Sequence, residues 1–103
     1  MDQVVAHAEA RAADVLRART THGLLTAAFN FKVFLARVPD SGPIARADVT
    51  RISEIAERVI QHIDARIDAH GGSHASKLEF ASLIYRIRAR LEEIARWSRH
   101  FVA

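Results

Sequence analysis

The chain has 103 residues, which is enough for one domain with a hydrophobic core but too short for a two-domain enzyme. Half of the residues are hydrophobic, and with only four glycines and two prolines this composition favours helices over a sheet. The chain contains no cysteine, which excludes disulfides and thiolate metal sites.

The net charge of +3 is divided unevenly along the chain. Residues 1–39 hold five basic and three acidic side chains, residues 40–70 hold four and six, and residues 71–103 hold six and three. The segments therefore carry +2, −2 and +3. This alternation suits the packing of a middle helix between two neighbours, and it argues against one continuous basic face for nucleic acid.

Neither a signal peptide nor a membrane span is indicated. The start of the chain, Met-Asp-Gln-Val-Val-Ala-His-Ala-Glu, lacks the positive region and apolar run of a signal peptide. The most apolar stretch, residues 22–38, is too short to cross a membrane and contains Asn30, Lys32 and Arg37. We therefore expect a cytoplasmic protein with no membrane partner.

Residues 2–38 read as one long helix, kinked or unbroken, or as two helices that meet near residues 20–23. Threonine and glycine at this junction are weak helix formers, but no proline requires a break. An unbroken helix would be about 55 Å long at ~1.5 Å per residue. Its N-terminal half would then project unless a partner covered it, which predicts a homodimer.

The only clear loop predicted from the sequence, residues 39–43, has the composition Pro-Asp-Ser-Gly-Pro and separates this region from the next helix. That helix begins at Pro43 or after Asp48 and ends before Gly71, which is placed to be its C′ residue. Its apolar stripe has spacings of three and four residues: Val49, Ile52, Ala56, Val59, Ile63 and Ile67.

The last predicted helix covers residues 76–101 and opens with a capping box, Ser76-Lys-Leu-Glu79. A regular heptad seam then runs through Phe80, Ile84, Ile87, Leu91, Ile94, Ser98 and Phe101. The sequence thus predicts a single all-α domain over residues 1–103, an up-and-down bundle of three long helices, with a first helix that is kinked or split into two as the open alternative. Residues 2–70 would form a hairpin, and two copies of the chain would form a dimeric bundle.

Residues 22–38 resemble the H-box helix of the histidine kinase dimerisation and phosphotransfer domain. His22, Leu24 and Thr26 match the H-box pattern, and the apolar run that follows occupies the family's core positions. The segment after Ile52, with its Ala-Glu-Arg, resembles the family's second hairpin helix. The resemblance covers roughly residues 10–70. It implies a dimeric four-helix bundle beside which a response-regulator receiver domain docks.

Three positions depart from the family pattern. Gly23 replaces the acidic residue, Leu25 the basic residue and Ala27 the proline. The chain also has no ATP-binding domain after the hairpin and no phosphate-cradling loop. Autonomous ATP-dependent kinase activity is therefore not expected, and no cofactor is predicted.

The resemblance favours a small histidine phosphotransfer or dimerisation module of two-component signalling, with His22 as the phosphoryl acceptor. An exposed imidazole is partly unprotonated at neutral pH and can attack phosphorus. Thr26, one turn further on, would bind a phosphoryl oxygen or orient a water. The alternative is a non-catalytic helical module, a dimeric adaptor or regulator, in which replacing His22 changes nothing.

Other polar groups are better explained by structural roles. His62 and His70, with Asp64 or Asp68, would form a metal site only if further ligands joined them, and no metal is predicted. Lys32 lies on an apolar sector, either pairing across an interface or extending its charge to water.

Nucleic acid is not an expected partner. The arginines at 86, 88 and 90 fall on two sides of one helix, and no binding motif accompanies them.

Overall fold

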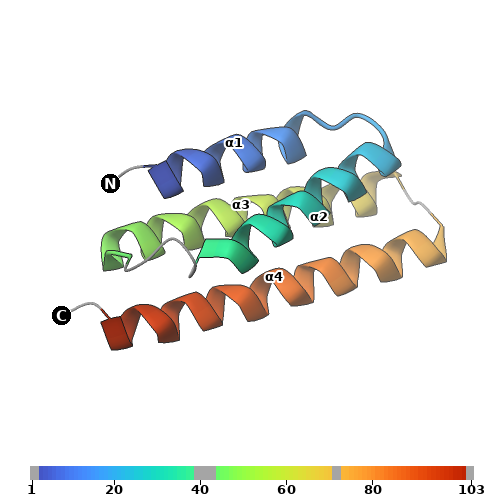
Figure 1. Ribbon diagram of the computed structural model, residues 1–103. Helices are drawn as coiled ribbons and strands as arrows, with labels where there is room; N and C mark the ends of the chain where they lie inside the picture. Colours follow the sequence, from blue (N-terminus) through green and yellow to red (C-terminus); the bar gives the residue numbers. More distant parts are fainter. Residues whose placement is uncertain (1–2, 39–43, 71–72, 102–103) are drawn as a thin grey trace.

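The computed structural model describes residues 3–38, 44–70 and 73–101, without the side chains of residues 69–70 and 98–101. These residues form four helices and no strand (Figure 1). The helices are α1 (Gln3–Arg17), α2 (Thr21–Arg37), α3 (Arg46–His70) and α4 (His74–Phe101). The prediction of an all-α helical bundle is confirmed.

The prediction of three long helices is wrong, because residues 3–37 form two helices rather than one. The chain leaves α1 after Arg17, and Thr20 adopts an extended conformation with φ −110° and ψ 160°. Its hydroxyl oxygen accepts a hydrogen bond from the Gly23 backbone N–H at 2.9 Å, which makes Thr20 the N-cap of α2. The projecting N-terminal half that motivated the homodimer prediction is therefore not formed.

Two further features stabilise this break. A Cβ at Gly23 would lie 3.0 Å from the Thr20 hydroxyl oxygen, so glycine leaves room for the cap. Arg66 of α3 donates hydrogen bonds to the carbonyl oxygens of Ala18 at 2.7 Å and Arg19 at 3.3 Å. These carbonyls follow the end of α1 and would otherwise lack protein partners. The turn between α1 and α2 is thus stabilised by Arg66, which lies 48 residues after Ala18 in the sequence.

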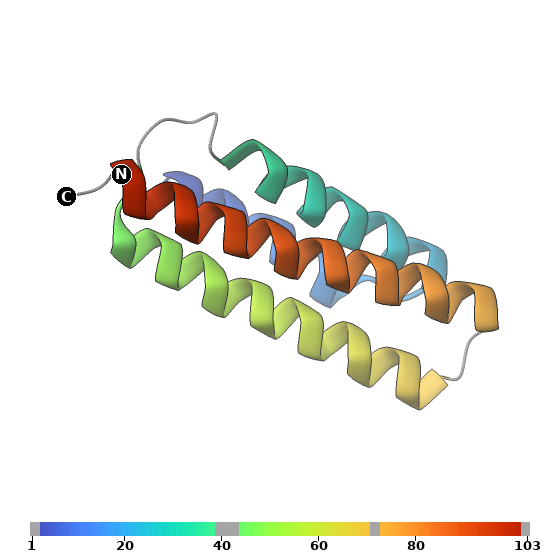
Figure 2. The ribbon, with the colours of Figure 1, turned by 90° about the horizontal axis from the view of Figure 1, so that it is seen from below.

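The four helices occupy the corners of a bundle in which α1 and α4 each pack against both α2 and α3. These contacts make α1 and α4 diagonal to each other, as are α2 and α3. Successive helices run in opposite directions (Figures 1 and 2). The helices of the predicted hairpin, α2 and α3, are therefore antiparallel but meet mainly through side chains in the centre. A single chain already supplies four helices.

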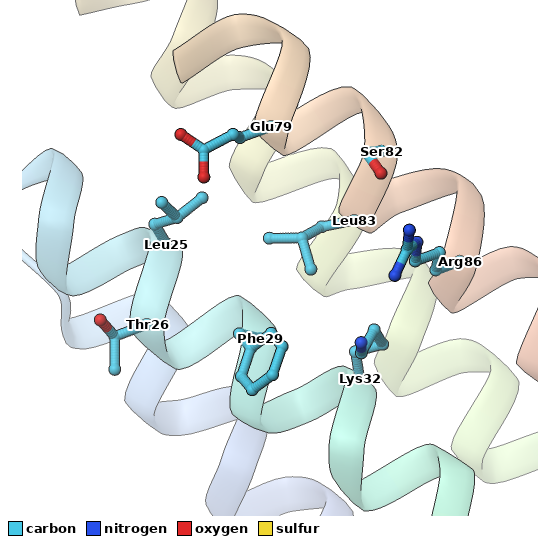
Figure 3. Close-up of a pocket in the computed structure, with 8 residues that line it drawn as sticks. All are labelled: Leu25, Thr26, Phe29, Lys32, Glu79, Ser82, Leu83 and Arg86. Carbon is cyan, nitrogen blue, oxygen red and sulfur yellow. The ribbon is translucent and has the colours of Figure 1, made fainter. Parts of the chain in front are cut away.

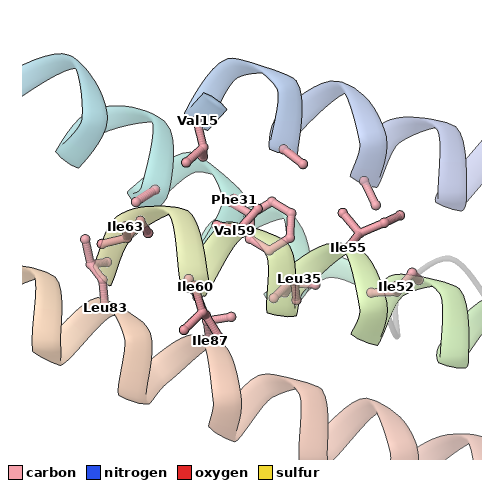
Figure 4. Packing of buried hydrophobic residues seen from close by; sticks show 14 of the residues in the cluster. Val15, Phe31, Leu35, Ile52, Ile55, Val59, Ile60, Ile63, Leu83 and Ile87 are labelled. Atoms are coloured by element: carbon pink, nitrogen blue, oxygen red, sulfur yellow. The ribbon is translucent and has the colours of Figure 1, made fainter. Parts of the chain in front are cut away.

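The core is centred on Phe31 and Leu35 of α2, which lie against the isoleucines of α3 (Figure 4). The heptad seam of α4 is confirmed for Phe80, Ile87 and Ile94, which are buried. The other buried core residues include Ala8, Ala12, Val15, Ala28, Ile52, Ile55, Ala56, Val59, Ile60, Ile63 and Leu83. Ile84 and Leu91 are partly buried against this cluster, and the Ser98 and Phe101 side chains lie outside the described residues.

Ion pairs join α3 to both of its neighbours. Glu9 of α1 pairs with Arg51 at 3.2 Å and Arg58 at 3.3 Å, and Glu57 pairs with Arg88 of α4 at 3.3 Å. The middle helix does pack between two others, as its charge predicts. However, only in the Glu57–Arg88 pair does the acidic residue lie on α3 and the basic residue on its neighbour, as the segment charges predict. All these side chains are well exposed, so the pairs contribute little stability.

Candidate functional site

His22 and Thr26 both lie on the exposed side of α2, one turn apart. His22 is the second residue of the helix, at one end of the bundle. Within the described part of the chain, no carboxylate or hydrogen-bond partner contacts its side chain. The structure thus brings the two residues onto one face without placing a general base beside the imidazole.

A groove between α2 and α4 begins beside Thr26. It encloses about 390 Å³ and has an apolar floor formed by Leu25, Phe29 and Leu83 (Figure 3). Phe29 is 49% exposed, whereas Phe31 of the same helix is buried and Phe34 is partly buried. The complete lining is Leu25, Thr26, Phe29, Lys32, Glu79, Ser82, Leu83 and Arg86.

Two cations lie on the side of this groove away from Glu79. The Lys32 ammonium lies 4.5 Å from the centre of the Phe29 ring, in a cation–π contact. Neither Lys32 nor Arg86 has a carboxylate partner among the described residues. The Lys32 side chain therefore lies along its own helix, with its ammonium over the Phe29 ring at the edge of the groove.

The hollow continues along the same two helices into a second cavity of about 520 Å³, which shares Lys32 and Arg86. Arg37 enters from α2 and has no carboxylate partner in the described ranges, whereas Arg90 of α4 bonds Glu93 at 2.9 Å. We refer to the two cavities, bounded by residues 25–37 and 79–93, as the α2–α4 groove.

The other side of α2 is also polar and cationic. A cavity of about 470 Å³ between α1 and α2 is lined by His7, Arg11, Asn30 and Arg37, together with Val33, Phe34 and Val38. Arg11 is paired with Asp14 of its own helix at 3.8 Å. No ion pair involves α2 in the described part of the chain, in contrast to α3. Lys32 and Arg37, the two charged residues of α2, thus both lack an ion-pair partner among the described residues.

Sequence reasoning missed the groove, because its two walls come from segments about 50 residues apart. One signal was nevertheless visible: residues 21–37 contain Lys32 and Arg37 but no acidic residue. A helix with cations and no acids on its surface has charges that only another element or another molecule can neutralise.

Of the residues considered for a metal site, His70 has its side chain outside the described part of the structure. Among the described residues, no three His, Asp or Glu side chains lie close enough to hold a metal ion. His62 instead lies on α3 between Arg58, which contacts α1, and Arg66, which contacts the turn that follows α1. Its Nε2 is buried without a hydrogen-bond partner, and burial, followed by the Arg66 charge, lowers its pKa.

The lowered pKa of His62 predicts a pH-dependent stability. Because the unfolded chain binds this proton more readily, folding should weaken as the pH falls from about 7 to about 5, below the ordinary histidine pKa. Urea unfolding of His62→Gln should show a flatter pH dependence over this range than the parent protein. The exposed His74→Gln serves as the control, and an unchanged slope in His62→Gln would refute the assignment.

No helix in the described ranges is both long and apolar enough to cross a membrane. Comparison of the chain with protein-family models, curated proteins and solved structures finds no match. The site is therefore interpreted from its own geometry.

Proposed function

We propose that this protein is a non-catalytic helical interaction module that binds a protein partner in the α2–α4 groove. The observation that carries the proposal is an apolar floor, with the half-exposed Phe29 at its centre, beside cations that have no carboxylate partner in the described chain. Amphipathic segments commonly dock in such grooves between helices.

Burial on binding would give the groove its affinity. Covering apolar surface contributes roughly 25 cal/mol per Å², and aromatic and arginine side chains dominate the binding energy of most interfaces. Phe29 and Arg86 supply one of each on facing helices. Both residues project from helices that pack into the core, so the backbone of the groove is already formed before a partner binds.

Site-specific photo-crosslinking in the native cell tests this proposal. A photoreactive phenylalanine analogue at Ser82, in the groove, should form an adduct with a defined protein. The same analogue at Glu92, exposed on α4 outside the groove lining, should not. Equal labelling from both positions, or no protein adduct from Ser82, would reject the groove as the binding site.

A second candidate function is phosphotransfer through His22, with Thr26 as its helper. It is favoured by the exposure of His22 in the first turn of α2, because backbone N–H groups at a helix N-terminus stabilise a phosphoryl group. The partner would be a receiver domain of two-component signalling. This candidate ranks second because the imidazole has no orienting partner among the described residues.

Labelling separates the two candidates. After incubation with a phosphorylated receiver domain, phosphotransfer predicts acid-labile, alkali-stable label that His22→Ala abolishes and His7→Ala, an exposed control, retains. The interaction module predicts no label on either variant. Label that persists in His22→Ala would exclude His22 as the acceptor.

The homodimer remains a prediction, now without the projecting helix that suggested it. Because one chain completes a four-helix bundle, its core needs no second copy. Light scattering during gel filtration measures the mass directly. A dimer that dissociates on Phe29→Ala would place a second copy in the groove.

A further inference from the structure

We infer that the occupant of the α2–α4 groove is an acidic amphipathic helix of a partner protein. The inference rests on the proposed function and specifies the chemistry of the partner. It is drawn from the distribution of charge, from the apolar floor and from the length of the groove.

The cations of the groove indicate an occupant that carries carboxylates. Lys32, Arg37 and Arg86 line it without carboxylate partners in the described residues, while Arg90 is already bonded to Glu93. The remaining acid, Glu79, lies near Leu25, away from Lys32 and Arg86 (Figure 3). An occupant should therefore carry its carboxylates where it meets the cations and none where it meets Glu79.

The apolar floor of the groove is complementary to a helix with one apolar face. Leu25, Phe29 and Leu83 form a strip with room for side chains spaced three or four residues apart. From residue 25 to residue 37 the groove is about 18 Å long at 1.5 Å per residue, so a helix of about 12–14 residues would fill it. Such a helix would cover Phe29 and pair Lys32 and Arg86 at once.

A second copy of this chain fits less well. A two-fold dimer whose axis passes through the middle of the groove would bring Lys32 and Arg86 of one copy against the same residues of the other. Like charges at close range disfavour that arrangement, particularly at low ionic strength. The positive charge of the groove thus disfavours a second copy of the same groove and favours an acidic partner.

Peptide binding to the isotope-labelled full chain tests the inference. The probe is a capped 14-residue helical peptide of alanine and leucine, with leucines on one face and three glutamates flanking them towards one end. A matched peptide carries lysines in place of the glutamates. The glutamate peptide should shift amide signals of residues 25–37 and 79–93, and its affinity should fall as salt rises.

Charge reversal supplies the decisive comparison. Lys32→Glu with Arg86→Glu should weaken the glutamate peptide about tenfold or more and should reverse the preference towards the lysine peptide. Arg19→Glu with Arg96→Glu, which makes the same change in net charge at exposed positions outside the groove lining, should change neither. Lys32→Gln with Arg86→Gln is the milder variant if the reversed one fails to fold.

Each outcome is informative. Equal binding of both peptides, or shifts outside the groove, overturns the inference. A dimer that depends on the groove residues would also overturn it, because the occupant would then be a second copy of the chain. The same holds if no peptide binds but a single-stranded oligonucleotide does, and if Lys32→Glu with Arg86→Glu abolishes that binding. If Ser82 still crosslinks to a protein while no acidic peptide binds, the proposed function stands and only the acidic-helix assignment fails.

Discussion

Replacing Phe31 with alanine should destabilise the fold by about 3–5 kcal/mol, whereas the same change at Phe29 should cost less than about 1 kcal/mol. The two phenylalanines are two residues apart on α2 and differ in their surroundings. Phe31 is fully buried at the centre of the core, where its loss leaves a cavity among α2 and α3 side chains. Phe29 is half exposed over the groove.

Urea unfolding followed by circular dichroism measures both free energies. A loss of 3–5 kcal/mol is a large part of the 5–15 kcal/mol typical of a domain, so Phe31→Leu provides a milder variant if Phe31→Ala does not fold. Similar losses for Phe29→Ala and Phe31→Ala would contradict the packing described here. They would also remove the argument that Phe29 is held at the surface for binding.

Arg66→Leu should cost about 2 kcal/mol, because hydrogen bonds made by a charged donor contribute about 1.5–3 kcal/mol and two carbonyls lose their partner. Arg66 ties the end of α1 to α3 through the carbonyl oxygens of Ala18 and Arg19. The change should lower the melting temperature by several degrees, at about 4–8 °C per kcal/mol for a domain of this size.

Arg58→Leu is the matched control for this prediction. Arg58 lies two turns earlier on the same helix and also reaches α1, but it forms only an exposed pair with Glu9 at 3.3 Å. Exposed pairs contribute at most about 1 kcal/mol, and Arg51 still pairs with Glu9. If Arg58→Leu destabilised the protein as much as Arg66→Leu, the special role of Arg66 in the turn would be refuted.

Local patterns predicted the helices well where the signal was periodic. The seam at Phe80, Ile87 and Ile94 is buried, and the apolar stripe of α3 lies in the core. The number of helices was not predictable in the same way. The break before α2 depends on the Thr20 cap, which is local, but also on Arg66, which lies 48 residues from Ala18. A single sequence does not reveal that contact.

The candidate site was even less accessible from sequence. His22 and Thr26 were predicted to share an exposed face, and they do. Their proposed chemistry came from a family resemblance that the comparisons neither supported nor tested. The groove arises only when α2 and α4 pack side by side, which brings Phe29 and Arg86 into one lining through tertiary structure.

The apolar residues of α2 form two separate surfaces, one in the core and one in the groove. The inner face of the helix, through Phe31 and Leu35, satisfies the core of one chain without a second subunit. Its outer edge, through Leu25 and Phe29, remains accessible beside Lys32. The inner apolar face of the helix thus completes the core, and we propose that its outer apolar edge binds a partner.

The most direct test of this account is a calorimetric titration with the partner captured at Ser82. It compares the two most exposed aromatic side chains among the described residues. Phe29 lies in the groove, and Tyr85, which is 74% exposed, lies on α4 outside the groove lining. Phe29→Ala should weaken binding about tenfold, while Tyr85→Ala should leave it unchanged. Loss of affinity in Tyr85→Ala alone would show that the partner binds elsewhere on the bundle.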